Sequence, residues 1–439
     1  MEIKNREYDS QILLAAEAVL RGYRVYLGTH AAIYALLKNK KSRAGIYLDK
    51  STQPAHRMAW VRLRTETYCI LDAELSPMIS ENILREIFPS RVYENSEKLI
   101  DKFFVVGPTA SLIAKEYFKE NSSIVKITGW PRIDIWEKYG SLIYEKEIVN
   151  IQKRYGHFFL FASNFGVVRD PETTQHLKNP DSISETTLVS FETVKSNFEN
   201  FKRAVKLIKK WDSDDSFPPI VLRPHPSEPI SVWKKELGSM KKTRIVSTGD
   251  ITQWILASQG IIHAGSTSSI QAYYAKKPVF LLSNLTNPIV ETMGQRISNY
   301  LLSSQPEISG LDFTSTTNNP DYSPNSLEDT ITKPYGGSIN QILNVFDDLL
   351  NTPCSAHRRV PLFFSQVNFK SLRRAGGLLK DELYWKWGRI NIHSQMQVIP
   401  WGLDRRRIKK ILAIDPKFHQ IQIRRMALNL WEFDSETCK

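Results

Sequence analysis

The first group of residues that could do chemistry is the motif Arg223-Pro224-His225-Pro226-Ser227-Glu228, which directly follows an apolar run at 219–222. The prolines fix the backbone as it leaves the predicted strand, so we expect Arg223 and His225 to point into a crevice. A guanidinium and an imidazole can hydrogen-bond a phosphate there, or stabilise the negative charge on a departing nucleotide. The alternative is a proline-rich turn with His225 as a local cap. The combination of strand, prolines, base and acid favours a binding or catalytic site.

A second candidate is the run His263-Ala264-Gly265-Ser266-Thr267-Ser268-Ser269, between a predicted strand and a predicted helix. A glycine turn followed by hydroxyls at a helix N-terminus suits an anion, because backbone N–H groups and the helix dipole both favour negative charge. We expect Ser266, Thr267 and Ser268 to hold a phosphate or a sugar carboxylate. Helix capping by Ser266 or Thr267 is compatible with that role.

Asp250 is the third candidate, in the run Ser247-Thr248-Gly249-Asp250-Ile251. Two interpretations of this carboxylate remain open. Asp250 is either the N-cap of the following helix, or a nucleophile or base that acts on the anomeric carbon of a sugar.

Two further motifs lie near the expected domain junction. In Gly129-Trp130-Pro131-Arg132-Ile133-Asp134 the chain turns sharply after a strand, and Arg132 and Asp134 are expected to pair within a structural hinge. Asn164, at the end of the next strand, either hydrogen-bonds a ligand or shapes its own turn.

Short β-branched and aromatic runs that alternate with helical patterns must position these residues, and this alternation predicts parallel sheets wrapped by helices. Residues 1–140 are expected to form an N-terminal Rossmann-like domain on the acceptor side, and residues 155–335 a second Rossmann-like domain that binds a nucleotide-sugar. A closing helix is expected at 336–350. The predicted strands fall at 24–28, 45–48, 68–71, 103–106 and 124–127, and then at 157–164, 219–223, 244–247, 260–263 and 279–282.

The start of the first domain departs from the usual doubly wound pattern. An apolar strand normally precedes the first helix, but only Met1-Glu2-Ile3-Lys4 stands before a helix that we expect Asp9 to cap. Either the first strand is shortened or the true start lies upstream of Met1, and we favour a shortened strand. A chain truncated there would be an inactive relative.

Positive charge concentrates in residues 351–439, which carry 17 of the 59 Lys and Arg residues and 7 of the 46 Asp and Glu residues. This basic C-terminal extension also carries four tryptophans. Bases interleaved with aromatic residues suit an anionic membrane surface, and a solvated helical appendage is the alternative. No helix-turn-helix, RNP or zinc-finger spacing indicates nucleic acid.

Composition and cysteine usage restrict the class of protein further. Hydrophobic residues make up 41% and charged residues 24%, which is typical of a globular chain. No signal peptide or bilayer-spanning run is visible, so we expect a cytoplasmic protein, peripheral at most on the inner face of the inner membrane. The three cysteines are far apart and form no metal-binding pattern, so no metal is expected.

Taken together, the motifs resemble those of the surface carbohydrate biosynthesis proteins of bacterial lipopolysaccharide and capsule loci, which are similar to the retaining beta-Kdo transferases that use CMP-Kdo. The resemblance runs from about residue 2 to residue 350. It rests on KNREYD (4–9), GY (22–23), GIYLDK (45–50), GWPR (129–132), SNF (163–165), RPHPSE (223–228), GD (249–250) and HAGST (263–267).

The resemblance implies the GT-B fold, in which two Rossmann-like domains face a cleft and the second holds the nucleotide. It implies that His225 faces the phosphate and that Ser266 and Thr267 hold the phosphate or the Kdo carboxylate. It also implies a covalent sugar adduct on an aspartate, for which Asp250 is the candidate, with a CMP-sugar as donor substrate and no cofactor.

Two positions depart from the family pattern. Gln271 stands where relatives often have an acidic residue that binds ribose, and Gln271 can hydrogen-bond ribose without the charge. Asp72-Ala73-Glu74 replaces a run of three acids, which leaves Glu74 as the catalytic candidate in this segment.

The expected function is therefore transfer of Kdo or a related acidic sugar from a CMP-sugar to a glycan or lipid-linked glycan acceptor of O-antigen or capsule. One alternative is a CDP-glycerol-type glycerophosphotransferase, which would share a strand-end His-Pro and a Ser/Thr loop. The other is a non-catalytic protein of envelope assembly that binds a sugar nucleotide.

Overall fold

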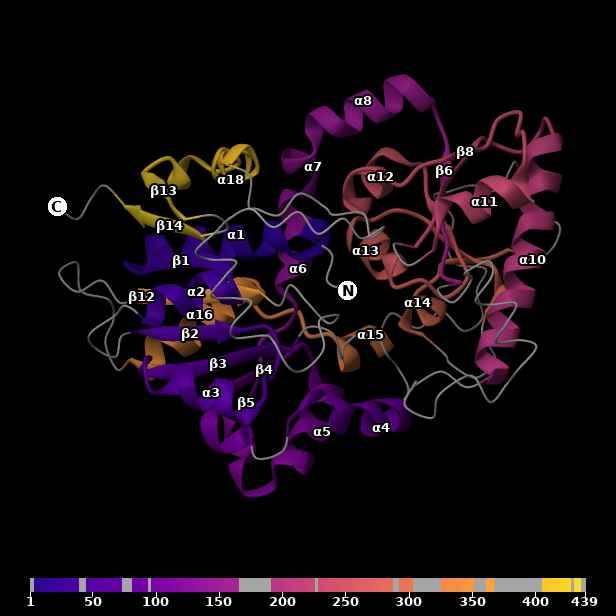
Figure 1. Cartoon of the computed structure of the whole chain (residues 1–439). Helices are drawn as coiled ribbons and strands as arrows, with labels where there is room; N and C mark the ends of the chain where they lie inside the picture. Colours follow the sequence, from indigo (N-terminus) through magenta and orange to yellow (C-terminus); the bar gives the residue numbers. More distant parts are fainter. Residues whose placement is uncertain are drawn as a thin grey trace. The chain divides into compact units, whose positions relative to one another are not determined.

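The computed structural model describes residues 4–38, 45–72, 81–93, 96–165, 191–225, 228–286, 292–302, 325–350, 361–366, 405–427 and 430–435. The chain divides into two compact units (Figure 1). The first comprises residues 1–76, 81–135 and 328–439, and the second residues 77–80 and 136–327. Each unit is built around its own largely parallel sheet with helices, so two Rossmann-like α/β units are present.

The sheet of the first unit has eight strands in the order β13-β14-β1-β12-β2-β3-β4-β5. The strands from β1 to β5, with β12 among them, are parallel, whereas β13 and β14 form an antiparallel hairpin at one edge. The bounds are β1 Arg24–Thr29, β2 Ile46–Asp49, β3 Thr67–Asp72, β4 Lys102–Val105, β5 Val125–Ile127, β12 Pro361–Gln366, β13 Ile421–Ala427 and β14 Leu430–Ser435.

β12 takes the place that the first strand of a doubly wound sheet normally has. It pairs in parallel with β1 on one side and with β2 on the other. If β12 is numbered as strand one and the other parallel strands follow in chain order, the order from β1 to β5 is 2-1-3-4-5-6, the flavodoxin-like order of doubly wound sheets. Residues 361–366 thus fill the position between β1 and β2 in this sheet.

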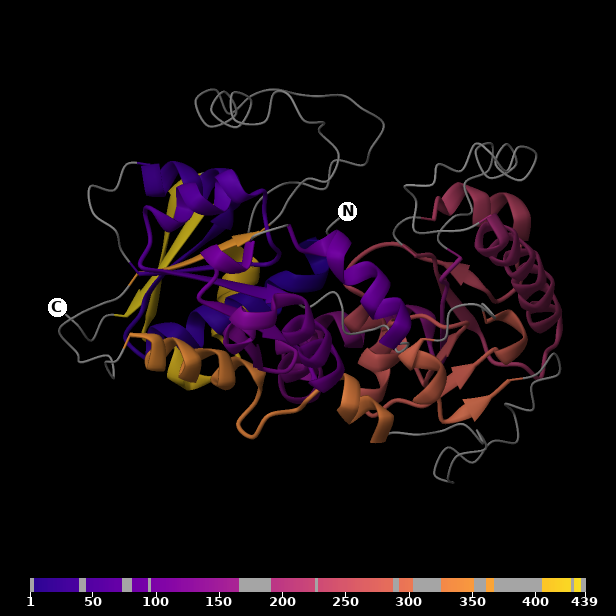
Figure 2. The same cartoon turned by 90° about the horizontal axis from the view of Figure 1, so that it is seen from below.

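Within residues 351–439 the structure describes 361–366, 405–427 and 430–435. β12, β13 and β14 belong to the first sheet, and Figure 2 shows the yellow C-terminal strands beside the indigo ones. Arg407 on α18 also donates to Asp9, at 2.6 Å and 2.9 Å. Asp9 lies inside α1 and does not cap it, because the helix already begins at Lys4.

The helices of the first unit include α16, which follows the return of the chain from the second unit. Asp134 accepts hydrogen bonds from the backbone N–H groups of Ser338 and Ile339 at the start of α16. Near its other end, Asp347 contacts Arg21 at 2.7 Å, so the closing helix packs within the first unit. The bounds are α1 Lys4–Leu20, α2 His30–Lys38, α3 Ala55–Arg62, α4 Glu81–Arg91, α5 Pro108–Phe118, α6 Pro131–Asp134, α16 Ser338–Leu349 and α18 Arg405–Leu412.

The second unit has a six-stranded parallel sheet in the order β11-β10-β9-β6-β7-β8. Its strands are β6 Phe159–Ala162, β7 Ile220–Arg223, β8 Arg244–Ile245, β9 Ile261–His263, β10 Val279–Leu281 and β11 Tyr300–Leu301. Its helices are α7 Gly140–Ile143, α8 Glu145–Tyr155, α10 Phe191–Ser213, α11 Ile230–Leu237, α12 Ile251–Ala257, α13 Ser268–Tyr274 and α14 Met293–Arg296; α15 Asn325–Thr330 lies where the chain passes back to the first unit.

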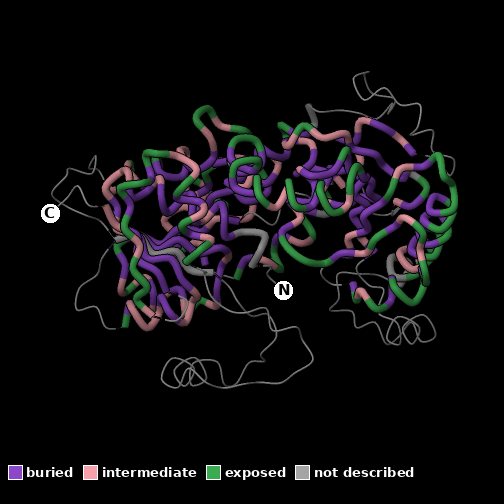
Figure 3. Tube along the Cα trace, turned by 90° about the horizontal axis from the view of Figure 1, so that it is seen from above, coloured by how far each residue is buried: buried purple, intermediate pink, exposed green. Residues whose placement is uncertain are grey.

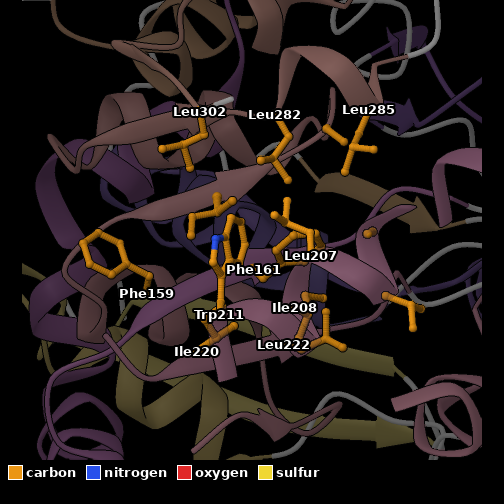
Figure 4. Close-up of a cluster of buried hydrophobic side chains, with 14 of the residues drawn as sticks. Phe159, Phe161, Leu207, Ile208, Trp211, Ile220, Leu222, Leu282, Leu285 and Leu302 are labelled. Carbon is orange, nitrogen blue, oxygen red and sulfur yellow. The ribbon is translucent and has the colours of Figure 1, made fainter. Parts of the chain in front are cut away.

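Both faces of the second sheet are covered, because side chains of β6 alternate between two apolar clusters. Phe159 and Phe161 pack on one face with Leu207 and Trp211 of α10 (Figure 4). Residues of α11 belong to the same cluster, whereas Leu160 packs on the other face with α8 and α12. Buried stretches therefore run along the strands (Figure 3). None of the helices that the structure describes combines the length and apolar character that a bilayer crossing needs.

Candidate functional site

The candidate site of the second unit lies at the carboxyl ends of its strands. Read from β8 to β11, the strand order is 3-2-1-4-5-6, so β6 and β9 are the strands between which the order reverses. Ligands of doubly wound sheets bind at this switch point. Asn164, which follows β6, donates from Nδ2 to the carbonyl oxygen of Gly265, which follows β9, at 3.1 Å. The structure therefore brings two of the predicted motifs together there.

Glu228 ties the loop after β6 to the loop after β7. Its carboxylate accepts hydrogen bonds from the hydroxyl of Ser163, from Phe165 N at 2.6 Å and from Trp233 Nε1 at 2.8 Å. Ser163 Oγ in turn accepts from the backbone N–H of His225 at 3.2 Å. Burial raises the pKa of Glu228, although these donors favour the charged form. Glu228 thus positions both His225 and the backbone around Asn164.

We expect Glu228→Ala to lower the free energy of unfolding by about 2–5 kcal/mol, because it leaves the N–H groups of Phe165 and Trp233 buried without their acceptor. Chemical denaturation followed by tryptophan fluorescence measures the loss. Glu236→Ala, at an exposed position on the neighbouring α11, is the matched control. A Glu228→Ala variant as stable as the control would contradict the positioning role.

Arg223 holds the loop before α12 rather than standing free at the strand end. Its Nη1 donates to the carbonyl of Thr248 at 2.8 Å, and its Nη2 donates to that of Gly249 at 2.6 Å. Loss of hydration lowers the pKa of Arg223 to about 10, against the nearby charge of Asp250, so the guanidinium stays protonated at neutral pH. Phosphate binding by Arg223 and His225 stays a prediction.

Asp250 is the N-cap of α12, as one of the two sequence interpretations requires. Its Oδ1 accepts from the backbone N–H of Thr252 at 2.8 Å, and the side chain is buried. The preceding Gly249 has a φ of 75°, and a Cβ there would lie 1.6 Å from Nε2 of Gln253. The capping contact does not test the nucleophile role, which stays a prediction.

His263 organises the loop that follows β9. Its Nδ1 accepts from the backbone N–H groups of Gly265 at 3.0 Å and Ser266 at 3.2 Å, and its Nε2 lies 2.9 Å from Ser298 Oγ. Because Ser298 Oγ donates to the carbonyl of Gly294, it accepts the Nε2 proton of His263. The sequence predicts that N–H groups of this loop face an anion, but those of Gly265 and Ser266 face His263 instead.

The hydroxyl residues of the loop differ in burial. The side chain of Ser266 is buried, and its Oγ donates to Ser268 Oγ at 3.2 Å. Thr267 and Ser268 are only half-buried. Gln271 is buried and donates from Nε2 to the hydroxyl of Thr252, a contact that links α13 to α12. Ribose binding by Gln271 and anion binding by Ser266, Thr267 and Ser268 stay predictions.

A pH effect follows from the buried state of His263. Desolvation lowers its pKa to about 3, whereas an unfolded histidine has a pKa of 6.5. The unfolded chain therefore binds the proton first as pH falls, and stability that is present above pH 6.5 is lost toward pH 3. We expect a loss of about 2 kcal/mol between pH 6.5 and 5, at about 1.4 kcal/mol for each pH unit.

His263→Asn tests this effect, because an amide oxygen can replace Nδ1 as acceptor but does not titrate. Denaturation curves at several pH values give the slope of the unfolding free energy for each variant. His157→Asn, at an exposed position in the same unit, is the control. A slope that His263→Asn leaves unchanged would disprove the linkage.

Two sequence predictions concern residues outside this cluster. Glu74 lies outside the described residues, so its catalytic role stays a prediction. In the predicted hinge motif, Asp134 caps α16, and the guanidinium of Arg132 lies over the ring of Trp130, 4.8 Å from its centroid. Within the described ranges, no group of three or more His, Cys, Asp or Glu side chains is placed to hold a metal ion.

Sequence reasoning missed the positioning roles of Glu228 and His263. Both residues stand inside motifs that it singled out, but motifs show only residue type and spacing. An acid or imidazole that follows a buried strand can face a ligand or turn back onto the backbone. One signal in the sequence points to the role of Glu228. Trp233 follows it by one turn of α11, and a buried indole N–H needs an acceptor.

Comparisons with known proteins give distant structural likenesses. No protein-family model matches the chain, and no curated protein matches its sequence. Solved structures that resemble it include S. aureus MnaA with UDP, at 14% identity and a TM-score of 0.40, over 82% of this chain and 83% of that chain. The UDP-GlcNAc 2-epimerase of Methanocaldococcus jannaschii has 15% identity and a TM-score of 0.41, over 79% and 84% of the two chains. The wall teichoic acid polymerase TagF has 12% identity and a TM-score of 0.35, over 70% and 74%. Similarity at this level does not indicate a shared activity.

Proposed function

We propose that this chain is a glycosyltransferase of the GT-B type, which transfers Kdo or a related acidic sugar from a CMP-sugar to a glycan acceptor of the bacterial surface. The second unit would bind the donor and the first unit the acceptor. The observation that carries the proposal is the contact of Asn164 with Gly265, which joins the ends of β6 and β9 at the switch point.

Several contacts support a nucleotide at this place. Glu228 fixes the loop that carries His225, and Arg223 fixes the loop that carries Asp250. Residues held in this way are preorganised, so they can stabilise charge on a departing nucleotide without moving at the moment of reaction. CMP as the nucleotide, and an aspartate adduct, come from the motif resemblance alone.

In the proposed reaction Asp250 attacks the anomeric carbon, and CMP leaves with the electron pair of the bond that breaks. His225 would face the phosphate, with Ser266, Thr267 and Ser268 near the phosphate or the sugar carboxylate. The hydroxyl of the acceptor then attacks the anomeric carbon and releases Asp250. Helix termini and basic side chains would supply the positive charge, with no metal in the proposed reaction.

Donor specificity and products test the proposal together. The purified chain is incubated with CMP-Kdo, and intact-mass spectrometry is expected to show a mass increase of one sugar, together with free CMP. Parallel incubation with CDP-glycerol separates the phosphotransferase, which would form a phosphodiester. CMP binding without turnover on either donor would contradict an enzyme and favour a sugar-nucleotide-binding assembly protein.

The proposal includes contact with an anionic membrane surface. This contact would be made by the exposed basic residues of α18, which are Arg405, Arg406 and Lys409. Buried Ile408 and Ile411 lie on the same helix, so α18 presents its charge outward. Sedimentation with vesicles of anionic and of neutral lipids tests the contact. Equal sedimentation with both would contradict it.

A further inference from the structure

A second polar cluster stands at the carboxyl edge of the first sheet, on two residues to which no site role has been assigned above. His30 follows β1, and Asp49 ends β2. His30 Nε2 lies 2.9 Å from Asp49 Oδ1. Since β12 stands between these two strands, the contact bridges the switch point of the first unit.

The carboxylate of Asp49 is surrounded by donors. Its Oδ2 accepts from the hydroxyl of Tyr68 at 2.9 Å, and its Oδ1 accepts from the backbone N–H of Lys50 at 2.8 Å. The side chain of Asp49 is 0% exposed. A carboxylate surrounded by donors acts as the acceptor toward His30, so Nε2 is the donor. In the neutral form of the ring the lone pair is then on Nδ1.

Within the described part of the chain, Nδ1 of His30 has no hydrogen-bond partner. The His30 side chain is 16% exposed. His263 provides the contrast inside the same molecule, because it is fully buried and both of its ring nitrogens bond to protein groups. His263 thus uses both ring nitrogens in contacts within the fold, whereas His30 uses only Nε2 in this way.

The ring of His30 is also held in place from the side. Tyr34, one turn along α2, stacks on it with centroids 5.6 Å apart and an interplanar angle of 19°. Trp60 of α3 packs on Tyr34 in turn, with centroids 5.4 Å apart. Tyr34 and Trp60 are both half-buried and extend an aromatic surface from the imidazole.

We propose that His30 is the general base of the first unit, which takes the proton from the acceptor hydroxyl, and that Asp49 is the residue that positions it. This inference rests on the proposed glycosyltransferase function. In this step the acceptor oxygen forms a bond to the anomeric carbon. The bond from that carbon to the carboxylate oxygen of Asp250 breaks, and Asp250 keeps the electron pair. The hydroxyl proton moves to Nδ1 of His30, and Asp49 stabilises the imidazolium.

His30→Asn is the first test, with His56→Asn, at an exposed position on α3, as the matched control. We expect His30→Asn to slow sugar transfer by about 10²–10⁴-fold, the usual contribution of a general base. CMP binding, measured by calorimetry, is expected to stay unchanged, because it belongs to the second unit. Added imidazole is expected to restore part of the rate in His30→Ala, which also guards against a variant that merely misfolds.

Asp49→Asn separates positioning from folding by a spectroscopic readout. Nitrogen-15 NMR of the histidine rings is expected to show the Nε2–H tautomer of His30 in the parent chain. In Asp49→Asn the amide can donate to Nε2, which moves the proton to Nδ1 and blocks the base. Transfer is then expected to fall while CMP binding persists.

The outcomes distinguish the two proposals. Transfer by His30→Asn within about threefold of the parent rate would overturn the base and leave the glycosyltransferase in place. A His30 tautomer that Asp49→Asn does not change would overturn the positioning role. A parent chain that neither binds CMP nor transfers sugar would overturn both proposals.

Discussion

Replacing Asp250 by asparagine is expected to abolish sugar transfer and to leave the fold intact. Asparagine caps helices about as well as aspartate, so the bond to the N–H of Thr252 and the stability of α12 should persist. An amide is not a nucleophile toward the anomeric carbon, so turnover should fall by at least ~10³-fold and the covalent adduct should disappear. Intact-mass spectrometry and CMP release measure these two effects.

The comparison with Asp250→Ala separates the two interpretations of this residue. Alanine removes the cap as well as the carboxylate and is expected to cost about 1 kcal/mol of stability. If Asp250 is only a cap, Asp250→Asn keeps full activity and Asp250→Ala loses stability. If Asp250 is the nucleophile, both variants lose the adduct. An adduct that remains in Asp250→Asn would assign the nucleophile to another residue.

Strands and helices of the two units could be predicted where their signals are local. The helix that Asp250 is expected to precede is present as α12, because Asp250 supplies a cap and the apolar residues have a helical spacing. Most predicted strands agree with the structure within two residues, since buried parallel strands are short apolar runs between polar loops. No strand is predicted at the position of β11, Tyr300–Leu301.

The C-terminal strands show what local patterns cannot predict. β13 contains Arg424 and Arg425, and its charge predicts a solvated segment. Pairing with β14 nevertheless places it at an edge, where charged side chains are common. β12 has a strand-like sequence, but its two partners, β1 and β2, lie more than three hundred residues before it in the chain. Sequence shows neither contact.

Site prediction was limited for a related reason. The motifs around Asn164 and Gly265 could be expected to meet, because parallel strands share a carboxyl edge. The direction of individual N–H groups could not be expected, since it depends on which side chain accepts their hydrogen bonds. His263 bonds to the N–H groups of Gly265 and Ser266, and it stands before them in the same predicted motif. No sequence motif indicates a role for His30, because its partner Asp49 lies on another strand and the two residues meet only in the fold.

Phe363→Pro is expected to unfold the first unit while the second unit keeps its structure. Phe363 is in the middle of β12, in register with Tyr26 of β1 and Tyr47 of β2. Proline cannot donate to the ladder and is excluded from central strands. The loss should be about 3 kcal/mol or more, a large part of the stability of one domain. Hydrogen exchange with mass spectrometry should show faster exchange in β1 to β4 and unchanged protection in β6 to β10.

Phe363→Val is the matched control, because valine also loses the aromatic ring but keeps the backbone N–H and favours strands. Slow exchange in β1 and β2 of the valine variant would show that Phe363→Pro loses stability through the backbone hydrogen bonds of β12 rather than through the aromatic ring. If β1 and β2 stay protected in the proline variant, residues 361–366 do not complete the sheet. A different segment would then lie between the strands that carry His30 and Asp49. The same experiment therefore tests the strand that supports the proposed base of the first unit.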